Sequence, residues 1–211
     1  MDFKIYMFVM KITVLVICIT IHEFSHAYIA WKAGDDTPKY HGRISLNPLD
    51  HLDPVGTVMM VLSSWVGFGI GWGKPVQINP SNFKSPRWDN LRVSLWGPLS
   101  NLLTALVAGI IIRLFGGFMP WQLSMFFVWL ASISIGLAMF NLLPISPLDG
   151  SHILSALLPI DAARKYDQFM AQYGMFVFLG LIFVGGNLLS LILLPIIRFL
   201  FGLLTGINFP F

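Results

Sequence analysis

Two histidines and a glutamate stand close together near the N-terminus, in the run His22-Glu23-Phe24-Ser25-His26. On a helix, residues four apart lie on one face, so His22 and His26 can offer two imidazoles to one tetrahedral Zn²⁺. Glu23 is then placed to act as general base toward a water molecule whose pKa the metal lowers to about 7. The run predicts zinc-dependent hydrolysis, although HExxH also arises by chance on amphipathic helices.

The surroundings of this run argue against chance. It lies within an apolar segment, residues 3–31, that is long enough to cross a bilayer. Ionisable side chains at hydrocarbon depth cost several kcal/mol, so they are candidates for function. At 1.5 Å per residue, the path from Lys32 back to His26 and His22 is roughly 9 to 15 Å. The predicted metal therefore lies below the membrane surface.

The composition indicates an integral membrane protein. Of the 211 residues, 56% are apolar and only 11% are charged, and the mean hydropathy is +0.75. The net charge of +3 comes from basic residues scattered between apolar segments, which is typical of juxtamembrane anchoring and not of a nucleic-acid surface. The single cysteine, Cys18, excludes an internal disulfide and a cysteine-based zinc site.

A catalytic zinc needs three protein ligands and one open position. Asp149 is the predicted third ligand, because Pro144, Pro147 and Gly150 prevent a continuous helix around it. Non-helical backbone at membrane depth is tolerated where it is buried in protein or lines a cavity. The alternative is a simple turn aspartate, since Asp-Gly is a common turn dipeptide. His152 is a rival ligand, or else a residue that supports the ligands or faces solvent.

Other polar residues have weaker signals. Asn101 and Asn141 lie in apolar segments, where each either forms an interhelical hydrogen bond or polarises a substrate carbonyl or its oxyanion. His41 and His51 lie in polar loop segments and are predicted to be surface histidines. Arg43, near the predicted mouth of the site, is expected to structure the loop rather than to take part in catalysis.

The apolar pattern predicts an all-α polytopic membrane protein, one domain over residues 1–211, with a bundle of about five to six membrane segments. Residues 95–115 and 121–143 are antiparallel neighbours joined by a short turn. Residues 55–70 contain three glycines and lead into a broken stretch, so a re-entrant element is at least as plausible as a span. Residues 173–206 exceed one span and form either a tilted helix or, as we favour, a hairpin.

The basic residues favour re-entry. If residues 55–70 re-enter the membrane, both flanking loops lie on one side, together with Arg164 and Lys165. The basic loop residues then gather there, and that side is cytoplasmic. If the segment spans, the charge bias largely vanishes. The predicted metal site therefore opens toward the cytoplasm.

These motifs together resemble the site-2 protease family of intramembrane zinc metalloproteases, in the small form without a PDZ domain. The resemblance rests on five stretches in the family's order: residues 22–27, 45–57, 72–76, 97–101 and 141–150. It implies that His22, His26 and Asp149 bind zinc, that Glu23 is the catalytic base, and that Asn101 and Asn141 lie near the site. Residues 71–80 look like the family's re-entrant β-rich loop, within a re-entrant and loop region of residues 55–94, and would dock substrate by strand addition. His152 departs from the basic residue that relatives often carry.

The resemblance implies an intramembrane zinc metalloprotease of the cell membrane, with one Zn²⁺ per chain. Its partners are transmembrane substrate proteins and the bilayer, and not nucleic acid. The alternative is a non-catalytic pseudoprotease that binds membrane proteins and keeps a structural zinc, against which the intact Glu23 argues. A membrane di-iron hydroxylase is disfavoured, because the chain has only five histidines.

Overall fold

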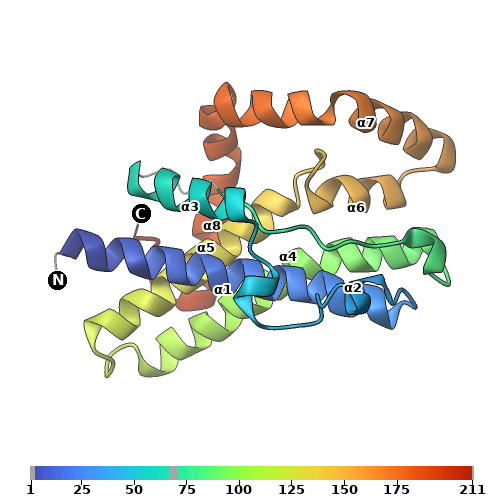
Figure 1. Cartoon of the computed structure of the whole chain (residues 1–211). Coiled ribbons are helices and arrows are strands. Elements are labelled where there is room, and N and C mark those ends of the chain that lie inside the picture. The colour runs from blue at the N-terminus through green and yellow to red at the C-terminus, as the bar shows by residue number, and fades with distance from the viewer. Residues whose placement is uncertain (1–2, 67–70, 211) are drawn as a thin grey trace.

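The computed structural model describes residues 3–66 and 71–210 and contains helices joined by loops (Figure 1). The helices are α1 (Phe3–Lys32), α2 (Thr37–Tyr40), α3 (Pro54–Val66), α4 (Pro86–Phe115), α5 (Trp121–Asn141), α6 (Asp149–Leu157), α7 (Ile160–Phe183) and α8 (Gly186–Thr205). Two short 3₁₀ turns, η1 (Pro48–Asp50) and η2 (Pro80–Asn82), lie in the loops.

The predicted fold class is wrong in one element, the β-rich loop. Within the described residues the structure has no strand, and the loop's only ladder contact is an isolated antiparallel bridge between Leu52 and Gly73. Pro75 cannot donate to a ladder, and the described part of the chain forms no strand beside residues 74–79. Residues 67–70, the end of the predicted re-entrant segment, lie outside the described residues.

The number of membrane segments is also lower than the predicted five to six. Among the described residues, α1, α4, α5 and α8 are long and apolar enough to cross a membrane. Helix α3 has 13 residues. At 1.5 Å per residue it extends about 20 Å, which is shorter than a hydrocarbon core of about 30 Å. Helix α7 does not qualify because its first half is polar.

The core of the bundle lies between α4, α5 and α8. Ala105, Ala108 and Ile112 of α4 pack against Ile135 of α5 and Phe201 of α8. Small residues at a helix interface let backbones approach closely, which is how membrane helices gain packing. Helix α1 lies across α4 and α5 (Figure 1), so the helix that carries His22 and His26 is held against α4.

Residues 173–206 do not form the predicted hairpin of two antiparallel segments. They contain the end of α7, a short turn and α8, and the two helices run in different directions (Figure 1). Helix α7 ends at Phe183 and α8 begins at Gly186. Figure 1 shows α8 leaving the end of α7 and passing into the bundle, where it packs mainly against α4 and α5. The two helices therefore do not lie side by side as a hairpin would.

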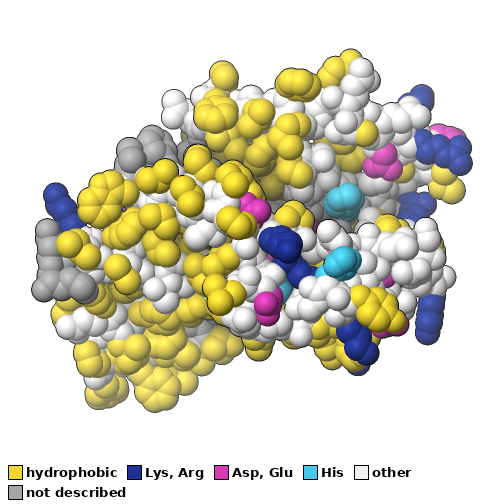
Figure 2. All heavy atoms as spheres, viewed as in Figure 1, with side chains coloured by type: hydrophobic (Ala, Val, Ile, Leu, Met, Phe, Trp, Pro, Cys, Tyr) yellow, Lys and Arg dark blue, Asp and Glu magenta, His cyan; other side chains and the backbone are white. Residues whose placement is uncertain are grey.

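Charged side chains gather at one end of the molecule. Figure 2 shows Lys and Arg concentrated where α1 ends, α4 begins and α6 joins α7, while hydrophobic side chains cover most of the remaining visible face. The loops between α1 and α4 are tied together at this end by Asp35. Its carboxylate accepts hydrogen bonds from Thr37, from the backbone N–H of Asn79 and from the side chain of Asn82.

Candidate metal centre

The structure brings His22, His26 and Asp149 together. The Nε2 atoms of the two histidines lie 3.0 Å apart. Oδ2 of Asp149 lies 3.1 Å from Nε2 of His22, and Oδ1 lies 3.3 Å from Nε2 of His26. All three residues are largely buried, with 5% and 7% of the two histidines exposed and 17% of the Asp149 side chain. The three residues therefore form one compact group of potential metal ligands.

Two different local structures position these ligands. His22 and His26 stand four residues apart on α1 and so share one face. Asp149 is the first residue of α6, directly after the proline-containing link that follows α5. A Cβ on Gly150 would lie 2.3 Å from the carbonyl oxygens of Leu142 and Leu143. Only glycine lets α6 start this close to the end of α5, which brings the Asp149 carboxylate to α1.

Helix α4 supports both histidines from behind. The carbonyl oxygen of Val93 lies 2.8 Å from Nδ1 of His26. Asn101, which is fully buried, has its Nδ2 atom 3.1 Å from Nδ1 of His22. Gly97 lies between them, and a Cβ there would be 2.3 Å from Nε2 of His26 and 2.7 Å from Cε1 of His22. Val93, Gly97 and Asn101 are spaced by four, so they form one stripe along α4 facing the group.

The donor set fits a zinc ion. A carbonyl only accepts hydrogen bonds, so Nδ1 of His26 carries the proton and its Nε2 offers a lone pair. Oδ2 of Asp149 is buried and makes no hydrogen bond with any residue that the structure describes. Ligand atoms at about 2.0–2.2 Å from a tetrahedral zinc lie roughly 3.3–3.6 Å from one another. The observed separations of 3.0 to 3.3 Å are close to that value.

Glu23 lies beside this group, next to a buried arginine. Oε2 of Glu23 is 3.9 Å from Nη2 of Arg43, and 15% of the Glu23 side chain is exposed. The Arg43 guanidinium also donates to the backbone carbonyls of Asp50 and Lys74. Burial lowers the pKa of Arg43, and the carboxylates of Glu23 and Asp50 partly offset this effect. Arg43 thus joins the two loops over the site, as expected from the sequence, and also faces Glu23.

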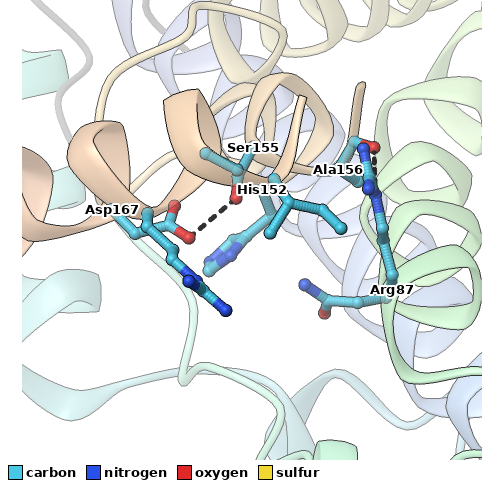
Figure 3. A pocket seen from close by; sticks show the side chains of 9 residues that line it. Arg87, His152, Ser155, Ala156 and Asp167 are labelled. Atoms are coloured by element: carbon cyan, nitrogen blue, oxygen red, sulfur yellow. Dashed lines mark hydrogen bonds between the residues drawn. The ribbon is translucent and has the colours of Figure 1, made fainter. Parts of the chain in front are cut away.

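His152 does not join the group. It is exposed on α6 and lines a pocket with Arg87 and Asp167, in which Ser155 donates to the Asp167 carboxylate (Figure 3). Asn141 donates its amide hydrogen to the carbonyl oxygen of Leu137, one turn earlier on α5. The structure therefore gives neither residue a contact with His22, His26 or Asp149.

The two loop histidines differ from each other. His41 is exposed, as predicted, whereas the prediction of a surface position for His51 is wrong. His51 is fully buried, with Nε2 2.6 Å from the carbonyl oxygen of Ser45. The polar composition of its loop concealed this, because the loop folds against the middle of α1 and buries its own polar groups.

The fold and the site together define a class. A multi-pass membrane protein with two buried histidines, a buried aspartate and a neighbouring glutamate is a membrane-embedded metallohydrolase. A family model described as peptidase family M50 matches residues 109–185, which include Asp149. The first relative, named "Putative zinc metalloprotease YwhC" from Bacillus subtilis, is 38% identical over 173 residues, covering 78% of this chain and 76% of its own length.

More distant relatives agree with this match. Proteins named "Putative zinc metalloprotease Rip2" are 30% identical in Mycolicibacterium smegmatis, over 74% of this chain and 60% of theirs, and 29% identical in Mycobacterium tuberculosis, over 82% of this chain and 67% of theirs. No solved structure matches the chain significantly. The chain belongs to peptidase family M50 and is an intramembrane zinc metalloprotease.

Sequence reasoning missed the supporting role of α4. The contact of Val93 with His26 uses a backbone carbonyl, which has no signature in residue type. Gly97 and Asn101 did carry a signal, since a glycine and an asparagine four apart in an apolar helix mark a close approach and a buried polar contact. The resemblance placed Asn101 near the site, but nothing in the sequence predicted that both residues would face the histidines.

Proposed function

We propose that His22, His26 and Asp149 bind one zinc ion per chain and that Glu23 is the general base for hydrolysis of peptide bonds in or near transmembrane segments of other proteins. The observation that carries this proposal is the convergence of three buried donor groups, one of them a carboxylate oxygen with no hydrogen bond to the described residues. The Asp149 carboxylate lies 3.1 and 3.3 Å from the Nε2 atoms of the two histidines, and a cation bound between these three buried groups would neutralise its charge.

The metal and the residues around it have separate roles in the proposed reaction. Zinc, when bound, supplies a Lewis acid that polarises the scissile carbonyl and acidifies water. Glu23 removes a proton from the attacking water and delivers it to the leaving amine nitrogen. Arg43 lies 3.9 Å from the Glu23 carboxylate and keeps it close to the loops. Because a helical substrate hides its carbonyls in backbone hydrogen bonds, it must unwind locally before Glu23 can act on it.

The proposed topology places the site open to the cytoplasm of the cell membrane. Helix α3 is too short to span, so the chain between α1 and α4 enters and leaves the single domain on one side of the membrane. Basic side chains gather where α1 ends, α4 begins and α6 joins α7 (Figure 2), and an excess of Lys and Arg marks the cytoplasmic side.

Tyr40 offers a test of this orientation, because it is 83% exposed at the same end. A Tyr40→Cys substitution in a Cys18→Ser background should react with a membrane-impermeant thiol reagent in inside-out vesicles and not in right-side-out vesicles. The reverse pattern would contradict the cytoplasmic assignment.

The ligand set is tested by metal analysis of detergent-purified protein. Wild type should hold one zinc per chain, Asp149→Ala should lose it, and His152→Ala should keep it, because His152 lies outside the group. Glu23→Gln should keep the zinc and lose cleavage of single-span reporter peptides by about 10²-fold or more. A metal-free wild type, after controls for stripping, would overturn the ligand set, whereas a fully active Glu23→Gln would overturn the role of Glu23.

A further inference from the structure

The two histidines of the group differ in what holds their outer nitrogen. Nδ1 of His26 faces the backbone carbonyl of Val93, which can only accept a hydrogen bond. Its tautomer is therefore set by the main chain of α4. Nδ1 of His22 faces the side chain of Asn101 at 3.1 Å, and an amide side chain offers either a donor or an acceptor.

The choice between these two orientations of the amide decides whether His22 can bind a metal. If Nδ2 of Asn101 donates to Nδ1, the proton of the imidazole must reside on Nε2, and Nε2 then has no lone pair for an ion. If Oδ1 faces Nδ1, the proton resides on Nδ1 and Nε2 is free to coordinate. The oxygen and nitrogen of an amide have nearly the same shape, so both orientations fit one cavity.

Metal binding by His22 requires the second orientation, because only then does Nε2 keep a lone pair for the ion. Asn101 is fully buried, and with Nδ2 toward His22 its Oδ1 atom makes no hydrogen bond with any described residue. A buried carbonyl oxygen without a donor costs about 1–3 kcal/mol. Turning the amide by half a rotation gives that oxygen the Nδ1–H of His22 as its donor, and Nδ2 then takes the buried position that Oδ1 held.

We infer that Asn101 is a positioning residue: its Oδ1 accepts the Nδ1–H of His22 and holds this imidazole in the tautomer that presents Nε2 to the metal. The inference rests on the proposed zinc ligand set. This role differs from the oxyanion contact, one of the two roles that the sequence left open for Asn101, because its amide faces the outer edge of His22 instead of the open position of an ion. Groups behind a ligand typically change metal affinity by about 10- to 100-fold when they are removed.

Zinc affinity, measured by competition with a chelator in detergent at fixed pH, tests the inference. Asn101→Leu is nearly the same size and cannot accept a hydrogen bond, so it should weaken zinc binding about 10- to 100-fold. Asn101→Asp keeps an acceptor and should bind within a few-fold of wild type. Thr104→Val is the matched control, because Thr104 lies one turn further on α4 and bonds only its own helix through Ser100.

A spectroscopic readout separates positioning from general support of the fold. In zinc-free protein with ¹⁵N-labelled histidine, at a pH where the rings are neutral, His22 of wild type should carry its proton on Nδ1. Asn101→Leu should shift that proton toward Nε2, and Thr104→Val should not.

Three results would overturn the inference. In the first, Asn101→Leu binds zinc as tightly as wild type but loses cleavage, which would assign Asn101 to the substrate and leave the zinc hydrolase intact. In the second, Asn101→Asp loses zinc as severely as Asn101→Leu. The third is an unchanged His22 tautomer in Asn101→Leu. A wild type without zinc would instead refute the proposed ligand set, and with it the ground of this inference.

Discussion

Gly97 is the position where the smallest change should have the largest effect on the metal centre. A Cβ at this residue would lie 2.3 Å from Nε2 of His26 and 2.4 Å from its Cε1. Ordinary contacts of a Cβ begin near 3.4 Å, so in Gly97→Ala the His26 ring or α4 must shift by about 1 Å. Metal–ligand distances tolerate changes of only about 0.2 Å, so a shift of that size removes His26 from the ligand set.

The stability of the same variant should change much less than its metal content. Overpacking typically costs about 1–3 kcal/mol. Replacing glycine by alanine inside a helix returns about 1 kcal/mol. We therefore expect Gly97→Ala to fold in detergent with a melting temperature a few degrees from that of zinc-free wild type, yet to hold less than a tenth of the wild-type zinc.

The matched control is Gly136→Ala on α5, where a Cβ would meet nothing within 4 Å. It should keep full zinc and gain slightly in stability. The assay is zinc per chain by mass spectrometry, together with circular dichroism melting of the same samples. Wild-type zinc content in folded Gly97→Ala would refute the argument that α4 packs directly against the ligand ring.

Two further predictions concern the loops over the site. Arg43→Gln should lower the free energy of unfolding by about 2–3 kcal/mol, because the carbonyls of Asp50 and Lys74 lose a buried charged donor. A melt matching wild type would argue against this, and Arg43→Lys should recover only part of the loss. Burial alone would raise the pKa of Asp35, but the hydrogen bonds from Thr37, Asn79 and Asn82 outweigh it and lower the pKa. Its stabilising effect is therefore present above its unfolded pKa, near 3.9, and is lost as the pH falls through the lower folded value. Melting temperatures between pH 7 and pH 3 should fall less steeply for Asp35→Asn than for wild type, and identical slopes would contradict the assignment.

The three residues that the structure brings together, His22, His26 and Asp149, could be predicted from local patterns, because each is positioned by its own stretch of chain. Helical spacing alone places His22 and His26 on one face, and the proline-rich link around Asp149 indicates a break at a polar residue. The meeting of these two stretches is non-local. It depends on Gly150 packing against the end of α5, which the residue types allow but do not require.

The wrong prediction of a β-rich loop has a non-local cause. A β-rich loop was expected over residues 71–80, yet a strand exists only where a second strand runs beside it, and pairing partners are distant in the sequence. Here one bridge between Leu52 and Gly73 forms, and the remaining extended residues are held by side chains such as Asp35 and Arg43. Hydrogen bonds from buried side chains thus hold this segment in place of a ladder of backbone hydrogen bonds.

Helix α4 explains why a metal centre can form between two apolar helices at all. Histidines need partners on both ring nitrogens, and a carbonyl oxygen inside a helix has a second lone pair with which it can accept one further hydrogen bond. The stripe of Val93, Gly97 and Asn101 provides these partners on one face of α4. Gly97 leaves room for the two imidazole rings, and the Val93 carbonyl and the Asn101 amide lie behind them. Substitutions on this stripe should therefore act on the metal more strongly than equal changes elsewhere on α4, since they alter the ligands' partners and not only the packing.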